Sequence, residues 1–235
     1  MTKYEIKNEN KDIKLEQDSF FNVKDSEITI SCNNKVKNLV LRDVLNSKII
    51  INVVGETKVL FVTTNIDTKN SIEVNCLKKN SVADIREVVL ENKKYIYENK
   101  ILISHKDKRT KTNYKFFGFA TDDSKIKIES ETYIARGMEF SNAAQNIKLI
   151  SDRNGIVEGQ PKLSIDEYNV KASHGNSIGQ INEREIFFLK SKGIAEVDAK
   201  WMILKGNISK VLDTFDDKEN IIEIFKKQYL EVPNE

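Results

Sequence analysis

Short strand-like segments separated by brief polar stretches fill residues 26 to 166 of this 235-residue chain, and this rhythm limits the possible folds most strongly. Several segments are rich in Ile and Val and alternate apolar with polar residues, which is typical of half-buried β-strands. The predicted strands are 27–31, 39–43, 48–54, 58–63, 71–75, 85–90, 100–104, 114–120, 125–129, 147–150 and 162–165. Their spacing, mostly about 8–14 residues, predicts a sandwich, a barrel or a β-solenoid.

The connections between these segments favour the solenoid over the sandwich. They rarely contain the Asn-Gly or Asp-Gly pair of a tight hairpin, and Asn154-Gly155 is the main exception. Asn, Asp and Lys supply most of the turns, and Asn tolerates the left-handed conformation that solenoid corners need. The segments show no strict sequence repeat, so the solenoid is a preference drawn from pattern.

The period changes from two to helical after Gly179. Helices are predicted over 183–192, 195–205, 208–215 and 218–231. Asn182 is the expected N-cap of the first helix, with Glu185 as its capping-box partner, and Gly193 suits the position after its end. These helices are expected to pack on an end of the solenoid, where a sheet edge needs cover.

Three regions follow from this pattern: a polar N-terminal arm or edge strand over 1–25, a β-helix core over 26–178 and a helical domain over 179–235.

The chain has 38 basic and 36 acidic residues, so its net charge of +2 gives no electrostatic case for binding nucleic acid or anionic lipid. The N-terminus lacks an apolar signal-like stretch, and no apolar run reaches membrane-spanning length. We therefore expect a cytoplasmic protein.

Few residues carry chemistry on their own. Cys32 and Cys76 lie in strand-like segments without metal-ligand spacing, which predicts buried free thiols. His105, at a strand end beside charged residues, is expected at the surface. Trp201 and Met202 are expected to pack within the helical domain. The sequence has no P-loop, G-x-S-x-G, H-E-x-x-H or G-x-G-x-x-G motif, which argues against an enzyme.

An ordered run of motif residues marks the chain from 161 to 206. The residues are Pro161, Leu163, Ile165, Val170, Ser173, His174, Gly175, Gly179, Glu183, Phe187, Phe188, Leu189, Ser191, Lys192, Gly193, Ile194, Ala199, Ile203 and Gly206. In this order they resemble the core domain shared by SufB and SufD, the scaffold proteins of the SUF iron–sulfur cluster assembly system. The Ser-His-Gly triplet is the SufD-like form, because SufB proteins carry a glutamate-containing form at that place and a cysteine upstream.

The resemblance implies a mainly β protein, a right-handed parallel β-helix with a small C-terminal α-helical domain. It implies a heterodimer with a SufB-like paralogue through the β-helices and a SufC-like ATPase held by the helices. The residues of the implied ATPase-contacting region are Phe187, Phe188, Gly193, Ile194, Ala199, Ile203 and Gly206. The long N-terminal helical region of typical members has no counterpart in this sequence, which implies a reduced member or a paralogue.

His174 is the candidate ligand. Imidazole can bind iron and replaces thiolate in some iron–sulfur centres, so the resemblance implies a transient cluster shared with a partner rather than a tightly bound cofactor. Ser173 and Gly175 are expected to support the geometry of a polar loop around it. Ala172 stands where a cysteine often precedes Ser-His-Gly. The thiolate is therefore expected from the partner.

Two other readings remain open. A solenoid can pair edge to edge with a second copy of itself, which would make the chain a structural homodimer. Some polysaccharide-acting enzymes use the same fold, often with Ca²⁺ held by acidic residues on one face. The expected cytoplasmic location and the lack of an obvious acidic ligand cluster make this reading the weaker of the two.

Overall fold

Fifteen strands and three helices make up the part of the chain that the computed structural model describes, residues 1–230. The strands are β1 (Thr2–Lys7), β2 (Asn10–Leu15), β3 (Ser19–Lys24), β4 (Glu27–Cys32), β5 (Asn38–Leu45), β6 (Lys48–Val53), β7 (Glu56–Thr64), β8 (Thr68–Cys76), β9 (Val82–Glu91), β10 (Ile96–His105), β11 (Lys111–Ala120), β12 (Lys125–Ile134), β13 (Asn142–Ser151), β14 (Ile156–Ile165) and β15 (Lys171–Gln180). The helices are α1 (Glu183–Ser191), α2 (Glu196–Val211) and α3 (Lys218–Leu230).

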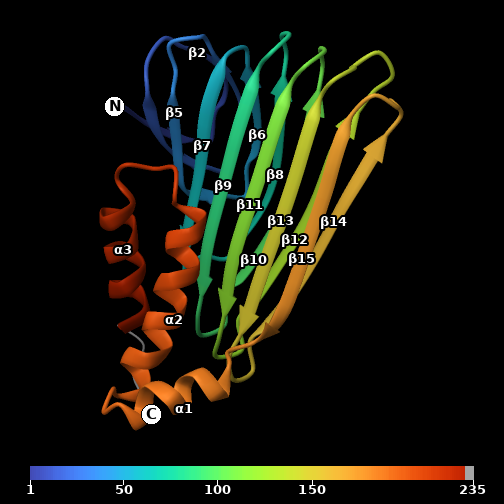
Figure 1. Ribbon diagram of the computed structural model, residues 1–235. Helices are drawn as coiled ribbons and strands as arrows, with labels where there is room; N and C mark the ends of the chain where they lie inside the picture. Colours follow the sequence, from blue (N-terminus) through green and yellow to red (C-terminus); the bar gives the residue numbers. More distant parts are fainter. Residues whose placement is uncertain (231–235) are drawn as a thin grey trace.

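The strands form two parallel sheets that face each other (Figure 1). Sheet A holds the odd-numbered strands from β1 to β15, and sheet B holds the even-numbered strands from β2 to β14. Because the chain alternates between the sheets, each strand pairs with the strand two places along. This confirms the predicted β-solenoid.

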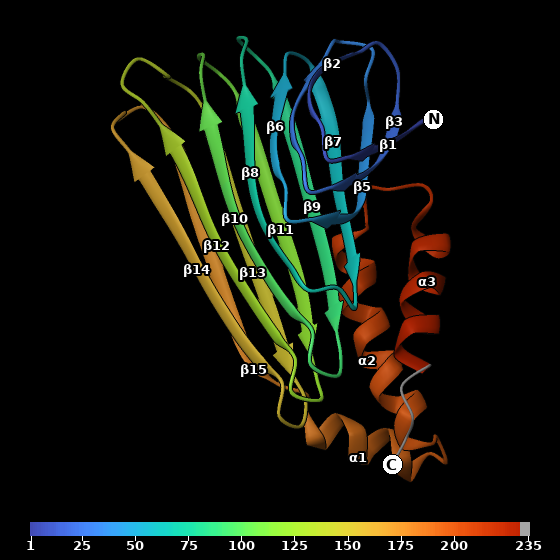
Figure 2. The ribbon, with the colours of Figure 1, turned by 180° about the vertical axis from the view of Figure 1, so that it is seen from behind.

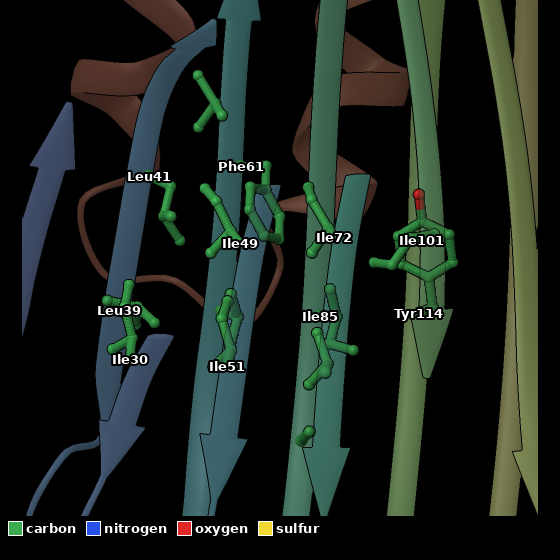
Figure 3. Close-up of a cluster of buried hydrophobic side chains, with 14 of the residues drawn as sticks. Ile30, Leu39, Leu41, Ile49, Ile51, Phe61, Ile72, Ile85, Ile101 and Tyr114 are labelled. Carbon is green, nitrogen blue, oxygen red and sulfur yellow. The ribbon is translucent and has the colours of Figure 1, made fainter. Parts of the chain in front are cut away.

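The space between the sheets is the main core. Every second residue of a strand points inward, and in-register pairing stacks these residues into columns that run from one turn of the solenoid to the next. One column joins Leu41, Phe61, Glu87, Phe116 and Ile147. Figure 3 shows part of this interior, where Ile49, Ile72 and Ile101 of sheet B face the side chains of sheet A.

The corners use left-handed residues, as the sequence predicted. Asn8, Asn46, Asn65 and Asn80 all have positive φ, and Asp residues take this conformation at further corners. Asn and Asp accept this conformation more readily than other residues with side chains. The corner chemistry therefore explains why few glycines are needed.

Two segments differ from their sequence-based expectation. Residues 2–24, expected as a polar arm or edge strand, form three strands, because Ile6, Ile13, Leu15, Phe21 and Val23 supply enough inward apolar side chains to extend the solenoid. The prediction of a polar loop around His174 is wrong, since that residue lies inside β15.

The predicted N-cap Asn182 and the predicted glycine after α1 are confirmed, but not all of the predicted helix bounds are. Asn182 caps α1 by accepting a hydrogen bond from the Arg184 N–H, and Gly193 follows the helix at φ +84°. The predicted helices 195–205 and 208–215 are one helix, α2, because Leu204, Ile208 and Val211 continue a single buried face across Gly206. The predicted end of the last helix, Glu231, lies outside the described residues.

Helices α2 and α3 pack on the outer face of sheet A and not on an end of the solenoid, while α1 lies below the ends of the strands (Figure 1). Their apolar side chains meet a second set of apolar residues that point outward from sheet A. These outward residues are Leu60, Val62, Val88, Leu90, Phe117, Phe119 and Ile150. Burying this face removes more apolar surface from water than capping one edge would, which is why the expected position was wrong. No helix within residues 1–230 is long and apolar enough to span a membrane.

Candidate functional site: the last turn of the solenoid and the adjoining helices

The last turn of the solenoid consists of β14 and β15, and each of them has a neighbour on one side only. β14 pairs with β12, and β15 pairs with β13. Figure 2 shows both strands at the edge of the molecule, away from α2 and α3. Their outer backbone N–H and C=O groups form a sheet edge that can accept another strand.

His174 lies on the interior side of this edge. Its register partner in β13 is Gln145, which is buried between the sheets, and parallel in-register partners point to the same side. His174 itself is exposed because no further turn covers it. The histidine therefore sits at the open end of the solenoid interior, where a chain pairing with β15 would meet it.

A polar layer lies directly beneath His174. The Gln145 amide donates to the Thr132 Oγ1 at 2.6 Å and to the Lys162 carbonyl at 3.1 Å, and its carbonyl accepts from the Ser130 hydroxyl at 2.6 Å. These bonds tie β12, β13 and β14 together under the edge. None of these three bonds uses the His174 imidazole.

Apolar side chains share the open end with His174. Ile165 of β14 is 37% exposed and Ile178 of β15 is 51% exposed, and both occupy inward positions by register with Ile134 and Leu149. Asn176 spans the gap between the two strands and donates to the Gly159 carbonyl at 2.8 Å. Exposed apolar groups beside unpaired strand edges are the signature of a surface that another chain covers.

The turn between β14 and β15 is rigid despite its exposure. The Glu167 carboxylate accepts backbone N–H groups of Gly137, Tyr168 and Asn169, and these bonds lower its pKa. Beside it, the Glu131 carboxylate accepts from the Ser164 hydroxyl and from Lys162, which lowers its pKa as well. Ser173 and Gly175, expected in a loop, flank His174 in β15 and point to the opposite side, since Gly175 faces Asn146.

The helices α1 and α2, which follow β15 in the chain, expose an apolar surface. Phe187 and Phe188 of α1 are 75% and 60% exposed, although both are large apolar residues. A groove of about 320 Å³ runs beside them, lined by Arg184, Glu185, Phe188, Leu189 and Ile203. Five of the seven residues of the expected ATPase-contacting region border this surface or the turn after α1, namely Phe187, Phe188, Gly193, Ile194 and Ile203. Ala199 is fully buried within the helices, and Gly206 lies exposed in the middle of α2.

The two cysteines are buried thiols, as predicted. Burial raises the pKa of Cys32 and of Cys76 to about 12, so both remain protonated and unreactive in the folded chain. Neither lies near His174, because Cys32 belongs to β4 and Cys76 to β8.

His105 contradicts its expected surface position, because it is only 1% exposed. It stacks in register between Cys76 and Ile134 on the inward column of sheet B. Its two ring nitrogens lie 2.6 Å from the Thr110 hydroxyl and 3.0 Å from the Thr112 hydroxyl. Neighbouring threonines thus satisfy the ring, which allows a histidine beside charged residues to be buried.

No sequence signal indicated that Gln145, Ile165 and Ile178 lie close to His174. Only the register with β15 places them near His174, and a register cannot be read from an irregular repeat. Within residues 1–230, no group of three or more His, Cys, Asp and Glu side chains is arranged to hold a metal ion.

Comparisons with known proteins agree with this geometry. Residues 46–207 match the family model described as "SUF system FeS cluster assembly, SufBD core domain". The chain is 26% identical over 163 residues to the iron–sulfur cluster assembly protein SufD of Escherichia coli (strain K12), which covers 66% of this chain and 35% of that protein. It is 30% identical over 100 residues to SufD of Bacillus subtilis (strain 168), covering 42% and 22%.

A further relative is an iron–sulfur cluster assembly SufBD family protein of Synechocystis sp., 31% identical over 87 residues, covering 37% of this chain and 19% of that protein. The matches thus span about a third or less of these relatives' lengths. The family model, in contrast, covers more than half of this chain and includes the last turn of the solenoid, α1 and most of α2. The chain belongs to the SufBD core-domain family of the SUF iron–sulfur cluster assembly system.

Proposed function

We propose that this chain is a non-catalytic, SufD-like scaffold subunit of an iron–sulfur cluster assembly complex. It pairs with a SufB-like paralogue through β14 and β15, and it binds a SufC-like ATPase through α1 and α2. The observation that carries the proposal is the open last turn, where a free strand edge, exposed isoleucines and the motif histidine coincide. The rest of the solenoid offers no comparable edge beside motif residues.

In this proposal the cluster is cargo that passes through the complex. His174 donates an imidazole nitrogen to iron from the open end of the solenoid, while thiolate ligands come from the partner, since Ala172 supplies none. A site completed by two chains holds its cargo only while the chains are paired. Ser173 and Gly175 are small residues on the outer face of β15. Gly175 in particular leaves room for the neighbouring Asn146 side chain.

The role of His174 is tested by assembling clusters on the purified complex. His174→Ala is expected to leave pairing intact and to reduce the cluster absorbance and its Mössbauer signal. Ser177→Ala is the matched control, because Ser177 is an exposed residue of the same strand. Undiminished cluster formation on an intact His174→Ala complex would remove the histidine from the proposal.

The ATPase contact is tested by co-purification. Replacing Phe187 and Phe188 together by Ser is expected to abolish capture of the SufC-like ATPase, since two exposed aromatic anchors would be lost. Ile96→Ser is the control, because Ile96 is a 45% exposed apolar residue on β10 of sheet B, outside the proposed contact region. Failure of the wild-type chain to bind the ATPase contradicts the scaffold assignment.

A homodimer is the second candidate, and the same open edge favours it. A strand edge with exposed isoleucines can pair with an identical edge about a two-fold axis. Native mass spectrometry with and without the SufB-like paralogue separates the two. A homodimer that persists in the presence of the paralogue supports this second candidate, and conversion to a heterodimer supports the first.

A further inference from the structure

We propose that the ion pair between Lys200 and Asp152 is a joint that ties the conformation of the last turn of the solenoid to the position of α1 and α2. This inference deepens the proposed function, because α1 and α2 are the proposed ATPase-binding helices and β14 is a proposed pairing strand. The Lys200 Nζ lies 2.8 Å from the Asp152 Oδ2. Lys200 belongs to α2, and Asp152 begins the corner that leads from β13 into β14.

The pair is shielded from water. The Lys200 side chain is 15% exposed and the Asp152 side chain is 11% exposed, whereas the partners of most other ion pairs of the chain are far more open. Charges held out of water attract each other more strongly, and removing one of them leaves the other poorly solvated. The contact can therefore hold two elements together where an exposed ion pair would slip.

The corner that Asp152 begins is stiff enough to pass a displacement onward. The Asp152 N–H donates to the Ala120 carbonyl, and its own carbonyl accepts from the Gly155 N–H, both at 3.0 Å. A Cβ on Gly155 would lie 2.2 Å from the Ala120 carbonyl oxygen, so the corner rests directly on the backbone of the preceding turn. A shift of Asp152 is thus carried to Ile156, the first residue of β14.

The other side of the joint continues to α1. Glu196 lies 3.6 Å from Lys200 through one oxygen and 2.7 Å from the Lys190 Nζ of α1 through the other. The Lys190–Glu196 side chains are 49% and 51% exposed, so this link to α1 is weaker than the contact between Lys200 and Asp152. Four alternating charges therefore connect α1, α2 and the corner before β14. The same α1 exposes Phe187 and Phe188.

The remaining polar anchors of the helices reach earlier turns of the solenoid. Lys115 of β11 contacts Asp213, Thr214 donates to Asp84 of β9, and Lys58 of β7 donates to the Thr214 carbonyl. These contacts hold the turn between α2 and α3 against well-paired central strands. Lys200 in contrast reaches the corner that leads into the last turn, whose strands β14 and β15 have one neighbour each and are therefore held less firmly than the central strands.

Hydrogen–deuterium exchange on the isolated chain tests the joint. Lys200→Met and Asp152→Asn are each expected to speed amide exchange in residues 156–165 by about fivefold, while residues 96–105 exchange as in the wild type. The charge swap that combines Lys200→Asp with Asp152→Lys is expected to restore the wild-type rates. Lys115→Met, which breaks a helix–sheet ion pair on an earlier turn, is the matched control and should leave 156–165 unchanged.

The proposal is overturned if both single variants exchange like the wild type in 156–165, or if exchange rises equally in 96–105. Adding the SufC-like ATPase extends the test to transmission. Binding is expected to alter exchange in 156–180 of the wild type and the charge swap, but not of Lys200→Met. If ATPase binding alters exchange in 156–180 of Lys200→Met as much as in the wild type, the proposal is also overturned. Failure of the ATPase to bind contradicts only the proposed function, because the isolated chain still decides the role of the ion pair.

Discussion

Two buried carboxyl groups illustrate how single polar residues are accommodated in this solenoid. Glu87, between the sheets, accepts from the Tyr97 hydroxyl, the Tyr114 hydroxyl and the Asn99 amide at 2.5, 2.6 and 2.9 Å. Glu91, at a corner, accepts from the Ile66 N–H at 3.0 Å, while its other oxygen is buried without a partner among the described residues. Hydrogen bonds thus offset the cost of burying the Glu87 carboxyl, whereas the buried Glu91 carboxyl lacks such compensation at one oxygen.

Replacing Glu91 by Gln is expected to stabilise the chain in alkaline solution. Burial raises the pKa of Glu91 to about 9, so the folded chain keeps a proton that the unfolded chain releases above its ordinary pKa of about 4.5. Stability from this group is therefore complete below pH ~4.5 and is lost as the pH rises toward ~9. Urea unfolding at pH 8 should show Glu91→Gln about 2 kcal/mol more stable than the wild type. A less stable variant at pH 8 would contradict this account of the carboxyl.

His105 should give the opposite pH dependence. Burial lowers its pKa to about 4, so its contribution is present above its ordinary pKa of about 6.5 and is lost as the pH falls toward ~4. His105→Gln cannot titrate in this range but can keep a hydrogen bond to a threonine. The stability advantage of the wild type over this variant should shrink by about 2 kcal/mol between pH 7 and pH 5. A constant difference would mean that the histidine is charged or exposed in the folded chain.

Glycines play opposite parts in the helices around α1 and α2. Gly193 ends α1 in a left-handed conformation, and the N–H groups of Gly193 and Ile194 donate back to the carbonyls of Lys190 and Leu189. Gly206 lies inside α2, where an added Cβ would meet nothing within 4 Å. The first glycine is required by geometry, whereas the second lowers the stability of its helix.

Alanine at the two glycines should therefore act in opposite directions. Gly206→Ala is expected to raise the free energy of unfolding by about 1 kcal/mol, and Gly193→Ala to lower it by about 1–2 kcal/mol. If Gly206 belongs to the ATPase-contacting surface, Gly206→Ala should also weaken ATPase binding while the chain becomes more stable. Urea unfolding and a binding titration on the same preparations separate the two effects. Destabilisation by Gly206→Ala would show that the helix needs glycine for packing.

The elements that could be predicted from sequence are those whose apolar pattern is local. The Ile- and Val-rich strands, the Asn corners and the cap at Asn182 belong to this group. β15 could not be predicted, because its sequence from Lys171 to Gln180 is polar and faces an open end. The burial of His105 depends on register with Cys76, and the burial of Glu87 depends on two tyrosines from other strands. Such long-range pairings leave no mark in the neighbouring sequence.

The candidate site could likewise be predicted only in part. The ordered motif identifies His174 as a candidate from sequence alone. Its place at the interior end of a free strand edge depends on the pairing of β13 with β15. The motif also identifies Phe187 and Phe188 of α1, but their exposure of 75% and 60% depends on how α1 packs. The burial of Ala199 depends on the same packing.

In the whole molecule, the outer face of sheet A, the outer face of sheet B and the strand edges of the solenoid are covered to different extents. Helices α2 and α3 cover the outer face of sheet A. The outer face of sheet B, seen in Figure 2, is neutralised by cross-strand ion pairs. These pairs are Glu27–Lys48, Lys69–Glu98, Lys100–Glu129, Lys125–Glu158 and Glu131–Lys162. Two free edges remain, β1 with β2 and β14 with β15, and only the second carries the motif residues on which the proposed pairing rests.

Hydrogen–deuterium exchange of the assembled complex tests whether the edge of β14 and β15 pairs with another chain. Pairing a free strand edge gives its outer N–H groups new acceptors and removes them from water. Mixing the chain with the SufB-like paralogue is expected to slow exchange in residues 156–165 and 171–180, while β6 on the face of sheet B, residues 48–53, exchanges as before. If a stable complex forms and 156–165 and 171–180 still exchange as fast as in the isolated chain, the two strands do not form the pairing surface.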